Sequence, residues 1–346
     1  MWTNLKKQII WGLGVFVLTF FVINLFCFYF ISPIKVPKVA TVADLTEYNR
    51  PALTKAGIDG HLTVAFVGDM MLDRGVKSSV SKNFAGDYAG LFSEVADQLS
   101  NYDLLFANLE GPISDRGVDQ GGLYSFRFDP KVLPALKAVG FTVFSVANNH
   151  TFNWGGEAFT DTLSRLAENG ITYVGGGFSG SEAYAGKVIN VEGVKVAFLT
   201  FSQFRDGGVN STSTRPGMAM VLEKEIAESV SKARAEADLV VVSYHFGEEY
   251  EKLPNDFQQK YAKLAIDAGA DLIIGHHPHV VQTLEQYKNV YIIYSLGNFI
   301  FDQYFSPETM QGGLLEVEIN PGSKRIEKVI LKKVNLNKKF QIESII

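Results

Sequence analysis

Cysteine is almost absent from this chain, since Cys27 is the only one among 346 residues. A single thiol cannot form a disulfide within the chain, so no disulfide framework holds the fold. Basic residues are not in excess either. The net charge is −5, which is not the electrostatic pattern of nucleic-acid-binding proteins, and we expect no nucleic-acid partner. The sequence also has no G-x-S-x-G elbow and no P-loop, so neither a serine nucleophile nor a P-loop phosphate site is supported.

One long stretch lacks charge altogether, from Ile9 to Ile31. At about 1.5 Å per residue, a helix of this length spans a hydrocarbon layer of ~30 Å. The run is too long for the apolar part of a typical signal peptide, and no small-residue cleavage site follows it closely. A lipoprotein is disfavoured because Phe26, not a small residue, precedes Cys27. We therefore predict an uncleaved transmembrane anchor over residues 9–31.

The anchor divides the chain into four predicted parts. Residues 1–8 carry Lys6 and Lys7, and this basic end favours a short cytoplasmic tail with the globular part outside the cell. Residues 32–60 contain three prolines and no sustained periodicity, which is typical of a linker. Residues 61–346 form the predicted globular domain. The expected location is therefore the cell membrane, with one crossing and an extracellular domain.

The globular part alternates strand-like and helix-like segments before its character changes. Helices are predicted over residues 88–99, 132–139, 156–168, 222–237 and 254–268, and Gly140 and Gly269 follow two of them as helix stops. The final third instead has antiparallel hairpins, with turns at Lys288-Asn289 and Pro321-Gly322. This order predicts one α/β domain of two sheets with outer helices.

Polar side chains that suit metals follow several short apolar runs. These residues are Asp69, Glu110, His150, His245, His276, His277 and His279. Apolar runs of this kind are typical of strands buried on both faces. Ligands of open α/β sheets bind at the carboxyl ends of the strands, so we expect these side chains to meet at one rim. Imidazoles together with carboxylates predict one or two transition-metal ions, Mn, Zn or Fe.

Neighbouring residues suggest roles around such a centre. Asn149 offers a neutral oxygen ligand, and the adjacent His150 could protonate a leaving group. Two ions held by mixed ligands would activate water and neutralise a developing oxyanion. Arg127 could clamp an anionic substrate group or could equally be a solvated surface residue. Asn298 follows Gly297 and could also face the rim.

Several longer segments resemble the CapA family of capsule and poly-γ-glutamate biosynthesis proteins, which are related to calcineurin-like metallophosphatases. The matching segments are GDMMLDR, NLEGPIS, FRFDPKVLPALKAVGF, ANNHTFNWG, HFGEEYEKLPNDFQQKYAKLAIDAGADLIIGHHPHVVQ and YSLGNFIFDQ. The resemblance implies a four-layer α/β/β/α sandwich and an outward-facing, membrane-anchored domain. It further implies a part in making, exporting or releasing an anionic cell-surface polymer, with the membrane synthase of that polymer as partner.

The resemblance also implies a ligand set. By position it places around the metal Asp69, Glu110, Asn149, His245, His277 and His279, with His150 beside them. One departure concerns the Asp-x-His start of metallophosphatases, because Met71 stands where the histidine would be, so one ion would lose an imidazole. His276 could also replace His277. Three functions remain open: a metal-dependent hydrolase or transferase on the polymer, a non-catalytic subunit of a synthase complex, and a phosphoesterase for a small phosphorylated substrate.

Overall fold

The computed structural model describes residues 60–346, and the predicted tail, anchor and nearly all of the predicted linker lie outside them. Among the described residues, no helix combines the length and apolar character needed to cross a membrane.

The first sheet contains the amino-terminal strand and the carboxyl-terminal hairpin. Its order is β17-β16-β15-β1-β2-β3-β4, and β14 pairs with β1. The strands are β1 (Leu62–Met70), β2 (Leu104–Leu109), β3 (Phe141–Ser145), β4 (Thr172–Val174), β14 (Asn298–Ile300), β15 (Gln311–Asn320), β16 (Arg325–Leu336) and β17 (Ile342–Ile345). Strands β1 to β4 are parallel, whereas β15 pairs with β1 in the antiparallel direction. Nearly every residue of β1 and β2 is buried, as their apolar sequences predict.

The second sheet has the order β12-β13-β11-β10-β7-β6. Its strands are β6 (Lys187–Val191), β7 (Val194–Ser202), β10 (Leu239–His245), β11 (Leu272–His276), β12 (Leu284–Tyr287) and β13 (Val290–Ile293). A small third sheet contains β5 (Gly176–Gly177), β8 (Gly208–Val209) and β9 (Gly217–Ala219). The two large sheets share one apolar core, in which Phe66 and Phe106 of the first sheet pack on Phe198 of the second.

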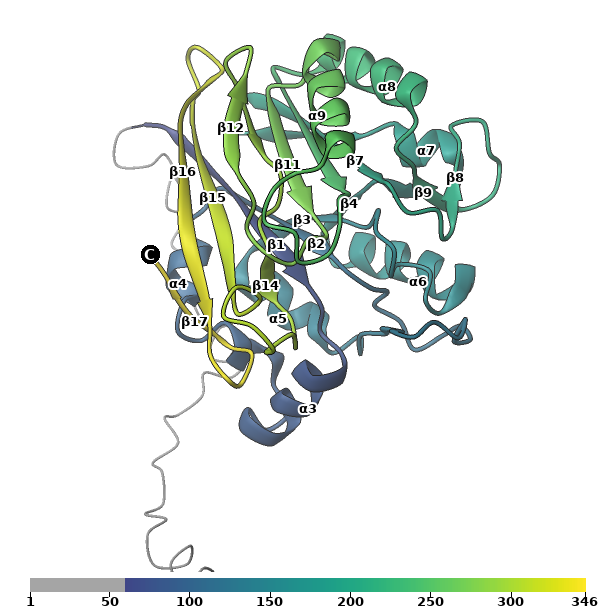
Figure 1. The fold of residues 1–346 in the computed structure, drawn as a ribbon, viewed down its shortest axis with the longest axis vertical. Coiled ribbons are helices and arrows are strands. Elements are labelled where there is room, and N and C mark those ends of the chain that lie inside the picture. Colours follow the sequence, from purple (N-terminus) through teal and green to yellow (C-terminus); the bar gives the residue numbers. More distant parts are fainter. Residues whose placement is uncertain (1–59) are drawn as a thin grey trace, which may run out of the picture. The chain divides into compact units, whose positions relative to one another are not determined.

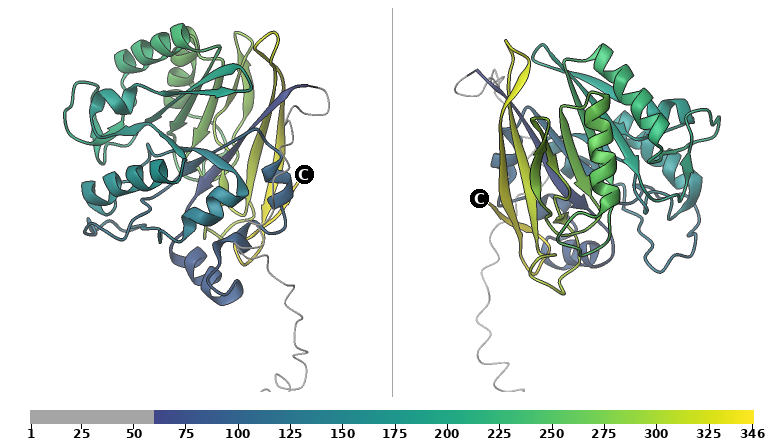
Figure 2. Two further views of the ribbon diagram at one scale, coloured as in Figure 1. Left: turned by 180° about the vertical axis from the view of Figure 1, so that it is seen from behind. Right: turned by 45° about the horizontal axis from the view of Figure 1, so that its top comes forward.

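The helices are α3 (Arg74–Asn83), the 3-10 helix η1 (Tyr88–Leu91), α4 (Ala96–Ser100), α5 (Val132–Val139), α6 (Gly155–Glu168), α7 (Gly180–Tyr184), α8 (Glu223–Glu236) and α9 (Asp256–Ala268). Four of them cover the outer faces of the paired sheets. Helices α8 and α9 pack on the second sheet through a separate apolar cluster. Helices α5 and α6 lie on the other side, against the first sheet (Figures 1 and 2). The mixed α/β sheet architecture predicted from the sequence is confirmed.

Most local predictions agree with the structure. Helices α5 and α9 end at Gly140 and Gly269, whose φ angles of 106° and 117° favour glycine. The turn at Lys288-Asn289 joins β12 to β13, with left-handed backbone at both residues. Helix α9 begins with a capping box that pairs Asn255 with Gln258.

Two local predictions are wrong. The predicted helix over residues 88–99 is instead η1 followed by a turn and the short α4. Gly90 packs on the ring of Phe84, and the chain turns there so that Phe92 meets the ring of Phe141 at 6.0 Å. The carboxyl-terminal strands are not all antiparallel either. Strand β14 runs parallel to β1, because the chain passes from the second sheet back to the first at this point.

Gly68 allows β14 to approach β1 closely. A Cβ atom at Gly68 would lie 1.9 Å from the carbonyl oxygen of Gly297, so only glycine fits there. This contact lets the amide of Asp69 donate a hydrogen bond to Gly297 at 2.8 Å and places Asn298 in register with Asp69. The end of β1 is thereby fixed at the junction of the two sheets.

Candidate metal centre

The ends of five strands meet at one place. Asp69 and Glu110 come from β1 and the residue after β2, and Asn149 follows β3 in the first sheet. His245 ends β10, and the His277-Pro278-His279 segment follows β11 in the second sheet. The structure brings these predicted ligands together, all of them buried or nearly so. Their roles as ligands remain predictions.

Asn108 connects the two carboxylates. Its Nδ2 donates to Asp69 Oδ1 at 2.8 Å and to Glu110 Oε2 at 3.3 Å. Asn108 lies opposite Asp69 in the parallel pairing of β1 and β2, which explains why it reaches both. Asn148 Nδ2 donates in turn to Asn108 Oδ1 at 3.2 Å. The side-chain amides of Asn108 and Asn148 therefore fix the positions of the carboxylates of the first sheet.

The second sheet adds imidazoles through a strained segment. His277 and His279 have φ angles of 98° and 59°, a left-handed backbone that non-glycine residues rarely adopt. The backbone N–H of His277 donates to Asp69 Oδ2 at 3.1 Å. His279 Nδ1 donates to Asn298 Oδ1 at 3.0 Å, so in the neutral ring the lone pair is on Nε2, which lies 3.7 Å from Glu110 Oε1.

Asn149 and His245 face each other across the two sheets. His245 Nε2 lies 2.8 Å from Asn149 Oδ1, and the His245 ring lies 4.9 Å from that of His277. Two ligand atoms each about 2.1 Å from one ion are roughly 3 Å apart, so this spacing also fits a shared cation. The ring of Phe204 lies 4.3 Å from that of His277 and shields this side.

Buried polar atoms that lack a hydrogen bond test whether a metal ion fits the site. Glu110 Oε1, His277 Nδ1 and both ring nitrogens of His276 are buried and make no hydrogen bond among the described residues, although such groups nearly always have a partner. Ligand atoms of Asp69, Glu110 and His279 lie within 4.8 Å of one another, and so do those of Glu249, His277 and His279. Carboxylates and neutral imidazoles are donors for a divalent metal ion, and such an ion would satisfy Glu110 Oε1 and His277 Nδ1. The site therefore fits a divalent ion.

Burial and neighbouring charges shape the protonation of the site. Burial, with the charge of Asp69 next, raises the pKa of Glu110 well above its ordinary value. For Asp69 burial also acts upward, but the nearby imidazoles of His276 and His279 prevail and lower its pKa. Burial lowers the pKa of His277 to about 3. In the ion-free chain this imidazole is therefore neutral at pH 7, the form that binds metals.

His150 lies beside the carboxylates. Its Nδ1 donates to Asn153 Oδ1 at 2.8 Å, and its Nε2 lies 3.9 Å from Glu110 Oε1. The ring of Phe126 lies 4.1 Å from the imidazole. Burial lowers the pKa of His150 to about 4. The geometry leaves Nε2 as the ring atom that can exchange a proton at the site.

The two other predicted catalytic residues have different positions. Asn298 contacts His279 and donates through Nδ2 to Gln303 Oε1 at 3.0 Å, which suits orientation of the imidazole. Arg127 is not brought into the group by any contact among the described residues. Its guanidinium lies over the ring of Trp154 at 3.5 Å.

Arg74, which the sequence reasoning missed, lies closer to the site than Arg127. Its guanidinium pairs with Asp302 and lies 4.7 Å from the centre of the Phe126 ring. Burial is the largest influence on the pKa of Glu110 and raises it. The positive charge of Arg74 acts in the opposite direction and lowers this pKa. Arg74 follows Asp73 in the GDMMLDR segment. Its position directly after this carboxylate was the signal in the sequence that could have pointed to Arg74.

The structure also separates His276 from His277. The His276 ring stacks on Phe106 of the core between the sheets at 6.2 Å, and its Nδ1 lies 3.4 Å from Asp69 Oδ1. His277 instead lies beside His245, which favours His277 as the ligand. Met71 offers no substitute for an imidazole, since its buried sulfur accepts the backbone N–H of Asp73 at 3.1 Å.

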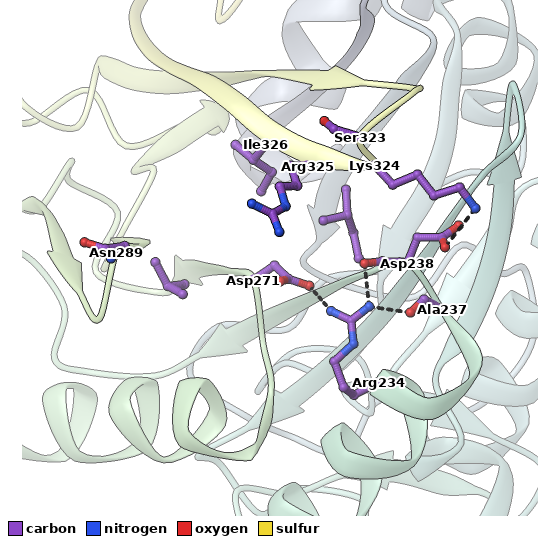
Figure 3. Close-up of a pocket in the computed structure, with 11 residues that line it drawn as sticks. Arg234, Ala237, Asp238, Asp271, Asn289, Ser323, Lys324, Arg325 and Ile326 are labelled. Atoms are coloured by element: carbon purple, nitrogen blue, oxygen red, sulfur yellow. Dashed lines mark hydrogen bonds and ion pairs between the residues drawn. The ribbon is translucent and has the colours of Figure 1, made fainter.

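A cavity of about 540 Å³ lies at the opposite ends of β10 and β11 (Figure 3). Four of its charged side chains pair with one another. Arg234 pairs with Asp271 and donates to the carbonyl groups of Ala237 and Asp238, while Lys324 pairs with Asp238 at 3.0 Å. The Lys324–Asp238 pair holds the β15–β16 turn against the start of β10, and we interpret the cluster as structural.

Comparisons with known proteins point to one family. The family model for the bacterial capsule synthesis protein PGA_cap matches residues 63–303. The capsule biosynthesis protein CapA of Bacillus anthracis is 37% identical over 277 residues, which cover 78% of this chain and 66% of that protein. The PGA biosynthesis protein CapA of Bacillus subtilis strain 168 is 35% identical over 250 residues, covering 71% and 64%. The chain thus spans just under two thirds of the length of these curated relatives.

A solved structure supports the fold. A novel phosphatase from Mycoplasma pneumoniae superposes with a TM-score of 0.51 at 15% identity, over 80% of this chain and 94% of that chain. At this identity the likeness concerns the fold alone.

Proposed function

The chain belongs to the bacterial capsule synthesis protein family, and from this we propose that it acts in making, exporting or releasing an anionic cell-surface polymer such as poly-γ-glutamate or capsule. Two relatives carry capsule or PGA biosynthesis in their names. The proposed site is a metal-dependent hydrolase or transferase centre in a four-layer, metallophosphatase-like domain. A membrane synthase of the polymer is the proposed partner.

One observation carries the catalytic part of this proposal. Among the described residues, buried Glu110 Oε1 and His277 Nδ1 make no hydrogen bond, and His150 lies beside the carboxylate of Glu110. Asp69, Glu110, Asn149, His245, His277 and His279 would hold one or two ions of Mn, Zn or Fe. Such ions, when bound, lower the pKa of water and polarise a carbonyl or phosphoryl group.

The residues of the chain then have distinct tasks. His150 would hold a proton at Nε2 for the leaving group, with Asn153 fixing the ring through Nδ1. Asn298 orients His279. Arg74 provides a positive charge near the site, which favours an anionic segment of polymer. The phosphoesterase alternative rests on the likeness of the fold alone.

The function can be tested in cells that lack the chain. Wild type should restore surface polymer, whereas His279→Ala should not, because this residue lies between both carboxylates. His61→Ala is the matched control, since His61 pairs with Glu327 away from the centre. Polymer is measured on washed cells with equal amounts of each variant in the membrane. Normal polymer with His279→Ala would contradict catalysis and favour the non-catalytic subunit of a synthase complex.

We also propose that residues 9–31 anchor the domain outside the cell, as the uncharged run predicts. Protease added to intact cells should remove residues 61–346 and leave the amino-terminal tail protected. A mature amino terminus beyond residue 31 would instead show a cleaved signal.

A further inference from the structure

The loop after β10 places a carboxylate beside the two strained histidines. Glu248 and Glu249 are both exposed, but only Glu249 has a ligand atom within 4.8 Å of His277 and His279. A second, independent observation indicates that this group binds an ion. His277 is 4% exposed, and its Nδ1 makes no hydrogen bond among the described residues.

The position of this loop is fixed by its neighbours. The backbone N–H of Tyr250 donates to the carbonyl of Pro278 at 2.8 Å, between the two histidines. Tyr250 has a φ of 67°, so the chain reverses sharply directly after Glu249. The hydroxyl of Tyr250 accepts a hydrogen bond from Gln303 at 3.1 Å, and Gln303 in turn accepts one from Asn298, the partner of His279. The backbone next to Glu249 is therefore held beside the imidazoles through Tyr250, by a network that includes His279 itself.

We propose that Glu249 is a metal ligand that completes the centre from its solvent side, together with His277 and His279. The inference rests on the proposed metal centre and adds a ligand that the predicted set lacks. Because Glu249 is exposed whereas the other ligands are buried or, for Asn149, partly buried, Glu249 is the ligand that an entering ion meets first.

The test is a titration of the full chain, stripped with chelator, with Mn²⁺ alone. Wild type, Glu249→Gln and Glu248→Gln are compared by equilibrium dialysis and elemental analysis. Glu249→Gln should weaken at least one Mn²⁺ site by about 10-fold or more, since changes around metal ligands typically cost 10–100-fold in affinity. Glu248→Gln removes the same charge one residue away and should bind as wild type does.

Two outcomes would overturn the inference alone: wild-type affinity in Glu249→Gln, or an equal loss in Glu248→Gln, which would show a general charge effect. Failure of the wild type to bind Mn²⁺ would overturn the metal centre itself, so the two failures are distinguishable. Each variant is first compared with wild type for thermal unfolding without metal, which separates lost ligation from lost folding. An exposed glutamine at position 249 should leave that unfolding unchanged.

Discussion

Replacing His279 by alanine is expected to empty the metal centre. His279 lies 3.4 Å from Asp69 Oδ2 and 3.7 Å from Glu110 Oε1, so its loss removes the donor that lies beside both carboxylates. Purified wild type should carry about one to two ions per chain, and His279→Ala below about 0.2. Saturating Mn²⁺ should stabilise stripped wild type by about 3 kcal/mol, or roughly 5–10 °C in Tm. His279→Ala should gain almost no stability from Mn²⁺.

The pH dependence of the same titration has a defined sign. The pKa of Glu110 is raised, chiefly by burial, so at any pH below that raised pKa a cation must displace a proton from this carboxyl group. Affinity for Mn²⁺ should therefore rise with pH until that raised pKa is passed. The control is His61→Ala, which should match wild type in ion content and in Tm gain. Wild-type metal content in His279→Ala would exclude this histidine as a ligand.

Replacing His150 by alanine should slow turnover by about 10²-fold or more and leave the metal in place, as expected for the loss of a general acid. His150 adjoins the predicted ligand Asn149, but its own hydrogen bond is to Asn153, outside the ligand set. Turnover is measured as cleavage of poly-γ-glutamate by metal-loaded full chain. Ion content is measured on the same samples, with His61→Ala as the control.

The pH profile separates an acid role from a structural one. Burial lowers the pKa of His150 to about 4, so an anionic substrate must raise it before the ring can act as an acid near pH 7. Activity that needs protonated His150 falls as pH rises through its pKa in the complex, and His150→Ala should lose this limb of the profile. If His150→Ala instead loses the ions as completely as His279→Ala does, its role is ligation, and another residue must supply the proton.

The sequence alone determined the strands whose ends form the site and most of the side chains at those ends. β1, β2, β10 and β11 are buried on both faces, so they are continuous apolar runs that can be recognised without a structure. The carboxyl ends of parallel strands share an edge, which is why Asp69 and Glu110 were expected to meet. The family was also predicted from its sequence segments and is confirmed by the match over residues 63–303.

The tertiary structure alone decided which other residues reach this edge. Arg74, rather than Arg127, lies near the carboxylates because α3 begins directly after β1, whereas Arg127 packs on Trp154. Glu249 reaches His277 and His279 because the loop after β10 bonds to Pro278. β14 can pair with β1 because Gly68 permits close contact between segments more than 200 positions apart. Local periodicity reports which face of a segment is buried, but the pairing of distant segments depends on how the whole chain packs, and this pairing completes the site.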